Sequence, residues 1–142
     1  MSGLSGYHGH LFQNRSRWDS FSPDQYRFAL LHAPRGLGRN PSSQRKFADL
    51  YGLFAARCAT EDRLAFLTAL DRKEQGAWGE PERLWTVVVE DPDLDVVREA
   101  ARLLAARLGP EAVRTRAYKL RAANPERSRA VLEGARRAPP GA

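Results

Sequence analysis

The sequence contains a single cysteine, Cys58, and only three histidines in 142 residues. One cysteine excludes an internal disulfide and a zinc site made of several thiolates, and it indicates a reducing, cytoplasmic setting. His8 and His10 lie close together, but no further ligand lies at a spacing that would complete a metal site. We therefore expect the chain to bind no metal and no other cofactor.

Long apolar runs are missing as well. No stretch approaches the roughly 20 apolar residues that are needed to span a bilayer. The N-terminal stretch MSGLSGYHGHLFQNRSRW has no continuous apolar segment and does not resemble a secretory signal. The chain is therefore expected to have no contact with a membrane. The apolar fraction of 42% and the charged fraction of 28% are typical of a globular chain that buries a core.

Motifs that carry catalysis are also absent. The stretch GLG at 36–38 lacks the Lys-Ser/Thr pair that follows in a phosphate-binding loop. Ser42 and Ser43 have no neighbouring base in the sequence. Acidic pairs such as Glu61 and Asp62 fall in first helical turns, where they complement the helix dipole. The sequence therefore predicts a binding protein and not an enzyme.

Charge is present in excess and is unevenly distributed along the chain. Residues 1–57 carry eight Lys/Arg and three Asp/Glu, residues 58–113 carry seven and twelve, and residues 114–142 carry eight and two. The overall net charge is +6, arranged as basic, acidic and basic segments. This pattern predicts electrostatic association with an acidic protein surface, with nucleic acid, or between copies of the chain.

Apolar residues recur at three- and four-residue steps along most of the chain, which predicts amphipathic helices. Several boundaries carry capping residues. Ser22 with Pro23 begins one helix, Gly109 with Pro110 ends one helix and begins the next, and Asn124 caps the last helix. These local signals predict where the helices start and stop.

We expect an all-α fold of about seven helices, in a compact bundle or a short stack of helical hairpins. The β-branched run 86–89 has strand propensity, but no second strand is evident, so a buried helix is expected there. The predicted helices cover 22–33, 43–57, 61–75, 82–90, 93–108, 111–122 and 125–137. The predicted domain division is an extended basic-aromatic arm over 1–20, a single helical domain over 21–137 and a disordered tail over 138–142.

The stretch ERLWTVVVEDPDLDVVREAARLLAARLG, residues 82–109, resembles a HEAT repeat. In that family a first helix ends at an Asp-Pro turn. The second helix begins with an acidic residue, followed by Val-Arg and then by a small residue and Leu at helical spacing. The resemblance implies stacked helical hairpins that act as a binding scaffold without catalytic residues. An irregular helical domain with one such hairpin is the alternative. The matching residues are Asp91, Pro92, Asp93, Val97, Arg98, Ala101 and Leu104.

A second stretch, QRKFADLYGLFAARCAT at 44–60, is similar to a helix-turn-helix. Ala48 and Gly52 occupy the fifth and ninth places, where small residues let two helices cross, and Cys58 occupies the buried fifteenth place. This resemblance implies a regulator that binds DNA or the transcription machinery. However, the base-reading places 54–56 hold Phe-Ala-Ala, which cannot pair with base edges. One continuous amphipathic helix explains the same residues.

Basic side chains give the clearest functional signal. Arginine suits bidentate binding of phosphate or carboxylate, and basic residues mixed with aromatics are typical of RNA binding. The sequence therefore predicts an adaptor that docks through basic surfaces on a larger protein or ribonucleoprotein assembly. The predicted binding residues form a C-terminal group, Arg114, Arg116, Lys119, Arg121, Arg127, Arg129, Arg136 and Arg137, and an N-terminal group, Arg15, Arg17, Trp18, Arg35, Arg39, Arg45 and Lys46.

Overall fold

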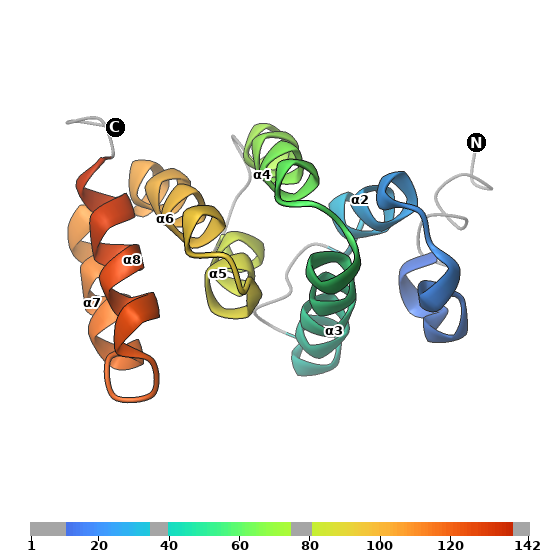
Figure 1. The fold of residues 1–142 in the computed structure, drawn as a ribbon, viewed down its shortest axis with the longest axis horizontal. Coiled ribbons are helices and arrows are strands. Elements are labelled where there is room, and N and C mark those ends of the chain that lie inside the picture. Colours follow the sequence, from blue (N-terminus) through green and yellow to red (C-terminus); the bar gives the residue numbers. More distant parts are fainter. Residues whose placement is uncertain (1–10, 35–39, 75–80, 138–142) are drawn as a thin grey trace. The chain divides into compact units, whose positions relative to one another are not determined.

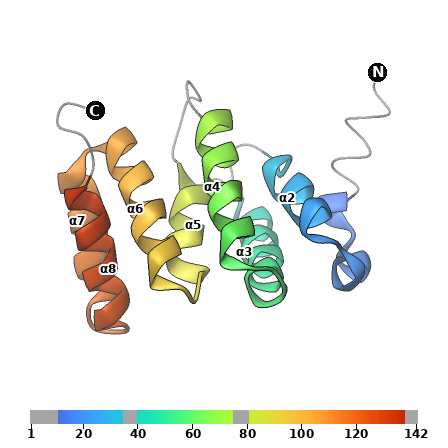
Figure 2. The ribbon, with the colours of Figure 1, turned by 45° about the horizontal axis from the view of Figure 1, so that its top comes forward.

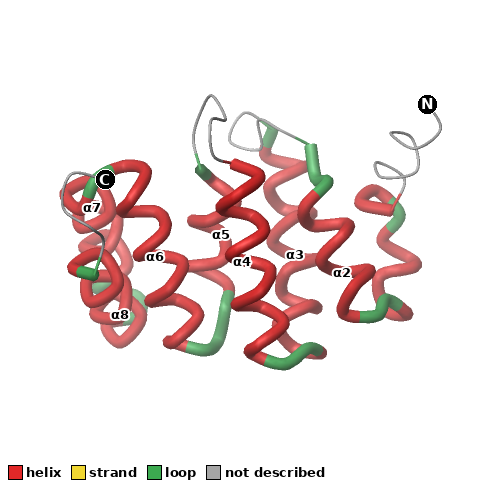
Figure 3. Tube along the Cα trace, turned by 90° about the horizontal axis from the view of Figure 1, so that it is seen from above, coloured by secondary structure: helices red, strands yellow, loops and turns green. Residues whose placement is uncertain are grey.

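The computed structural model describes residues 11–34, 40–74 and 81–137. Within these ranges the regular elements are helices and no strand occurs, as Figure 3 shows. The prediction of an all-α fold with about seven helices is therefore confirmed, and the β-branched run 86–89 is helical. The elements are η1 (Arg15–Ser20), α2 (Pro23–Leu31), α3 (Pro41–Arg57), α4 (Thr60–Glu74), α5 (Glu82–Glu90), α6 (Leu94–Leu108), α7 (Pro110–Leu120) and α8 (Pro125–Arg136).

The chain divides into two compact units, Met1–Arg83 and Leu84–Ala142, where the sequence predicts one helical domain over 21–137. The first unit carries twelve Lys/Arg and nine Asp/Glu, and the second carries eleven and eight. Each unit thus has a net charge of +3, so the acidic middle of the chain is shared between them. Residues 1–10 of the predicted arm, residues 75–80 at and after the end of the predicted helix 61–75, and the predicted tail at 138–142 lie outside the described residues.

The described part of the predicted extended arm is helical, which corrects that prediction. Residues 11–13 are helical and residues 15–20 form η1. Trp18 is only 3% exposed, and its indole Nε1 donates a hydrogen bond to the carbonyl oxygen of Leu11 at 3.3 Å. The hydroxyl of Tyr26 donates to the carbonyl oxygen of Trp18 at 2.6 Å. Burial of these large side chains favours the packed, helical conformation over an extended one.

Helix starts in the first unit follow the capping residues. Ser22 caps α2 and Pro23 lies in its first turn, as predicted, and Ser22 and Gln25 form a reciprocal capping box. Helix α3 begins at Pro41, two residues before the predicted start. The reason is Asn40, whose side-chain oxygen accepts hydrogen bonds from the backbone N–H groups of Ser42 and Ser43.

The core of the first unit is aromatic. Figures 1 and 2 show α2, α3 and α4 side by side, and these helices bring four fully buried rings together. The ring of Phe54 lies 5.9 Å from that of Tyr26, 5.8 Å from that of Tyr51 and 5.7 Å from that of Phe66. Ring pairs at these distances add to the stability gained by burial alone.

The core of the second unit is built from small and aliphatic side chains. Helices α6, α7 and α8 pack together (Figures 1 and 2), and the most extensive contact is between α6 and α8. A Cβ atom at Gly134 of α8 would lie 2.2 Å from the carbonyl oxygen of Arg98 and 2.9 Å from the Cβ of Ala101. Glycine is therefore required at this helix crossing. The hydroxyl of Ser128 donates to the carbonyl oxygen of Ala117 at 2.7 Å and ties α8 to α7.

The Asp-Pro turn between α5 and α6 forms as predicted. The buried carboxylate of Asp91 accepts a hydrogen bond from the N–H of Asp93 at 2.8 Å, and Asp93 in turn caps α6. Gly109 adopts a φ of 93°, which explains why a glycine ends α6 before Pro110 begins α7. However, α6 packs most closely on α8 and not on α5. This packing gives no support to a HEAT repeat.

Candidate functional site

The predicted C-terminal basic residues lie on α7 and α8, but they divide into two groups by their contacts. Five of them are exposed and have no side-chain partner among the described residues. We refer to these five as the α7–α8 cations. Arg129 and Arg136 lie seven positions apart and therefore share one face of α8. The α7–α8 cations are Lys119, Arg121, Arg129, Arg136 and Arg137.

The other three C-terminal arginines make internal contacts. Arg114 forms an ion pair with Glu111 at 2.7 Å on the surface of α7. The guanidinium carbon of Arg116 lies 5.2 Å from the centre of the Trp85 ring, a cation–π contact. Arg127 donates to the carbonyl oxygens of Val88 and Asp91 at 2.7 Å and 2.6 Å.

The contacts of Arg127 give this residue a structural role. The two carbonyls lie at the C-terminal end of α5, where backbone oxygens have no partner inside the helix. A charged donor there satisfies both oxygens and complements the negative end of the helix dipole. Arg63 does the same for α3, donating to the carbonyl oxygens of Ala55 and Cys58 at 3.2 Å and 2.7 Å. The number of arginines in the sequence is therefore larger than the number of cationic side chains that can contact a binding partner.

Tyr118 is a surface residue that sequence reasoning missed. Its side chain is 57% exposed, the highest value among the large apolar side chains of the described residues. It lies four positions after Arg114 and three before Arg121, so the three side chains follow one face of α7. That spacing is the signal that could have identified it. Tyrosine and arginine are enriched among the residues that dominate binding energy at protein interfaces.

The structure separates the N-terminal group of predicted binding residues. Arg15, Arg45 and Lys46 line one cavity of about 470 Å³ together with Pro41 and Ser42, and we refer to it as the Arg45 cavity. Arg17 is exposed and does not line this cavity. Trp18 is buried, so it offers no open face on which a base could stack. Arg35 and Arg39 lie outside the described residues.

Several contacts hold the cations of the Arg45 cavity in place. The Arg15 guanidinium forms an ion pair with Asp49 at 3.1 Å and lies over the Trp18 ring at 5.6 Å. The Lys46 ammonium donates to the side-chain oxygen of Gln13. Arg45 is exposed and has no side-chain partner among the described residues. The cavity thus combines two positioned cations with one that is free to move toward a ligand.

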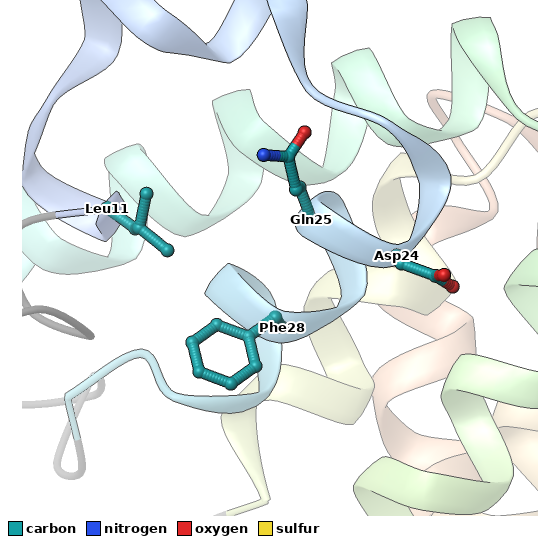
Figure 4. Close-up of a pocket in the computed structure, with 4 residues that line it drawn as sticks. All are labelled: Leu11, Asp24, Gln25 and Phe28. Atoms are coloured by element: carbon teal, nitrogen blue, oxygen red, sulfur yellow. The ribbon is translucent and has the colours of Figure 1, made fainter. Parts of the chain in front are cut away.

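A second pocket of about 250 Å³ is lined by Leu11, Asp24, Gln25 and Phe28 (Figure 4). Its two polar side chains already have local partners. Gln25 belongs to the capping box of α2, and Asp24 pairs with Arg27 on the same helix. The walls that remain are the apolar side chains of Leu11 and Phe28. Both polar side chains among the described lining residues of this pocket therefore have local partners.

The titratable side chains of the described residues do not form a metal-binding group. In the ranges that the structure describes, no three His, Cys, Asp or Glu side chains are placed to hold a metal ion. Burial raises the pKa of the Cys58 thiol, and the nearby Asp62 charge adds to this effect. A raised pKa makes the thiol a poor nucleophile, since the thiolate is the reactive form.

The helix-turn-helix interpretation is not supported. Helix α3 runs without a break from Pro41 to Arg57 and passes through Gly52, where that interpretation needs a turn. Phe54 and Ala55, which would have to face base edges, are buried in the first unit. No protein-family model, curated protein or solved structure matches the chain. A separate finding concerns membranes. None of the described helices has the length and apolar composition needed to cross one.

Proposed function

We propose that this protein is a non-enzymatic helical adaptor that docks on an acidic surface of a larger protein or ribonucleoprotein assembly. The observation that carries the proposal is the set of α7–α8 cations, which are exposed and have no partner among the described residues. Residues 110–137 contain eight Lys/Arg and three Glu, and two of those three carboxylates are already paired with Arg114 and Arg98. An acidic partner therefore meets few competing charges on these helices.

Tyr118 supports docking through the same two helices. An exposed aromatic ring beside arginines supplies apolar contact area at a low cost in side-chain entropy. The cations contribute mainly long-range attraction, which raises the rate of association and weakens as salt screens it. The cations thus attract the partner over a long range, and Tyr118 provides the short-range contact.

Substitution of three of the α7–α8 cations tests the proposal. Arg129, Arg136 and Arg137 are replaced together by Ala, and the immobilised protein is used to capture partners from an extract of the native source. We expect wild-type protein to capture a partner in a salt-sensitive manner and the triple variant to lose it. Arg127 is left intact because its contacts with α5 would confound binding with folding.

The control is a triple variant with the same loss of charge in the first unit, Arg17→Ala/Arg27→Ala/Arg72→Ala. It should capture the partner as wild-type does, and circular dichroism should show unchanged helix content in both variants. Capture of the same partner by the α8 triple variant would contradict the proposal. Nuclease treatment before capture distinguishes the two classes of partner. Where a nucleic acid is bound directly, the logarithm of affinity should fall with a slope of about 0.9 per phosphate contact against the logarithm of salt.

A further inference from the structure

The Arg45 cavity in the first unit presents three cationic side chains to a space that could hold a small molecule. Arg15 comes from η1, whereas Arg45 and Lys46 come from the first turns of α3. The hydroxyl of Ser42 adds a neutral hydrogen-bond donor. No acidic residue is among the described residues that line the cavity, although Asp49 pairs with Arg15. The three cations and Asp49 together give a local charge of +2.

We propose that the Arg45 cavity binds the phosphate group of a small phosphorylated molecule. A phosphate monoester carries close to two negative charges at neutral pH and three strong acceptor oxygens. Two arginines, one lysine and a hydroxyl match that number of charges and acceptors. A carboxylate, with one charge and two oxygens, needs only a single arginine. The local charge of +2 therefore favours a phosphate over a carboxylate.

The volume of the cavity indicates that the phosphate is attached to a further group. Small-molecule sites typically occupy about 300–1,000 Å³, and the Arg45 cavity, at about 470 Å³, falls within that range. A bare phosphate would leave most of this space to water. Pro41 gives the cavity an apolar wall against which the carbon skeleton of a sugar can lie.

The binding groups are the side chains and not the helix end itself. The N–H groups of Ser42 and Ser43 in the first turn of α3 already donate to Asn40. Contacts with Trp18, Asp49 and Gln13 hold Arg15 and Lys46 in place before any ligand binds. Such preorganisation lowers the entropy lost on binding. Lys46 keeps two further donors and Arg15 keeps most of its five.

Isothermal titration calorimetry at constant ionic strength tests the site with four probes: ribose 5-phosphate, inorganic phosphate, ribose and acetate. We expect saturable binding of the two phosphates and none of ribose or acetate. Tighter binding of ribose 5-phosphate than of inorganic phosphate would identify a phosphate monoester as the ligand. Equal affinity would identify free phosphate, and both results support the phosphate chemistry.

Variants link the binding to the cavity. Arg45→Ala should weaken ribose 5-phosphate binding by about tenfold or more, because a charge-assisted hydrogen bond is lost. Arg45 has no partner in the described structure, so this substitution should leave the fold intact. Arg17→Ala is the matched control on η1 and should bind as wild-type does.

Several outcomes would overturn the proposal. These are the absence of saturable binding of either phosphate, acetate binding as tight as phosphate binding, and equal affinity of Arg45→Ala and Arg17→Ala. An RNA oligomer with a 5′-hydroxyl that binds while ribose 5-phosphate does not would assign the surface to nucleic acid instead. The site goes beyond the proposed adaptor function, because the Arg129→Ala/Arg136→Ala/Arg137→Ala variant should bind ribose 5-phosphate normally.

Discussion

The two units of the chain pack their helices with different kinds of side chain. In the first unit the ring of Phe54 contacts three other aromatic rings from α2, α3 and α4. In the second unit Gly134 lets α8 approach the backbone of α6. Eleven of the thirteen aromatic residues lie before Leu84, so the second unit could not have been built with the aromatic core of the first.

The difference shows two routes to a stable helical core. Large rings bury much apolar area per residue, and α3 and α4 contact each other less extensively than α6 and α8 do. Small residues bury little area each, but they allow close backbone contact and many short-range dispersion contacts. The stability of the first unit should therefore be most sensitive to the loss of side-chain volume, and the stability of the second unit to a gain of side-chain volume.

The largest effect is expected from the loss of volume in the first unit. Phe54→Ala removes a fully buried ring from the centre of the aromatic cluster and should lower the free energy of unfolding by about 3–5 kcal/mol. Hydrogen exchange measured by mass spectrometry should show the main loss of protection in α2, α3 and α4. Phe54→Leu is the control and should cost less because most of the buried area is kept. An equal loss of hydrogen-exchange protection in α6 and α8 would contradict the distinction between the two cores.

A gain of volume should be costly in the second unit. Gly134→Ala places a Cβ against the carbonyl of Arg98 and should destabilise this unit by about 2–3 kcal/mol, since backbone must move. Gly52→Ala is the matched change in α3, where a Cβ would meet nothing within 4 Å. It should stabilise the chain by about 0.5–1 kcal/mol because alanine favours helix. Urea denaturation measures the free energy of unfolding of both variants. An unchanged stability of Gly134→Ala would contradict the close contact of α8 with α6 at Gly134.

Two arginines of α8 sharpen the distinction between structural and free cations. Arg127→Ala removes charged donors from the carbonyls of Val88 and Asp91 and should cost about 1.5–2 kcal/mol of stability. Arg129→Ala removes an exposed side chain that has no partner in the described part of the chain, and it should change stability by less than about 0.5 kcal/mol. Thermal unfolding followed by circular dichroism compares the two. Similar stabilities of these variants would remove the structural role assigned to Arg127.

The smallest effect concerns the reactivity of Cys58, which reports on the first unit alone. Because burial raises the pKa of this thiol, less thiolate is present at a pH near the ordinary thiol pKa of about 8.5 than in the unfolded chain. Alkylation by iodoacetamide should therefore be slower in the folded protein. Asp62→Asn should speed it, since the Asp62 charge also raises the pKa. Folded and unfolded protein reacting at the same rate would show that Cys58 is not shielded.

Much of the local structure could be predicted from the sequence. The capping box at Ser22, the positive φ at Gly109 and the cap at Asn124 all lie where the sequence places them. Such signals act between residues a few positions apart, so they can be recognised without the fold. The helical conformation of residues 11–13 and 15–20 was not predicted, because it depends on contacts such as the hydrogen bond from Tyr26 of α2 to Trp18. Prediction also placed the start of α3 too late, since Asn40 was not recognised as its cap.

The candidate sites were predictable only as sets of residue types. The sequence identified Arg15, Arg45 and Lys46 as basic, but not that they line one cavity. It could not separate Arg127, which binds carbonyls 36 and 39 positions earlier, from Arg129, for which the described residues offer no such contact. Tyr118 was missed because exposure depends on which face of α7 is covered by its neighbours.

By itself the sequence determined the helical class, most helix boundaries and the excess of positive charge, because helix caps, periodicity and composition are local properties. Only the tertiary structure decided which cations have no partner among the described residues, which ones bind the carbonyl oxygens at helix ends and which ones line the Arg45 cavity. It also decided that α6 packs most closely on α8, through Gly134. The physical reason is that hydrogen bonds and close packing join residues far apart in the chain, and local patterns carry no record of those partners.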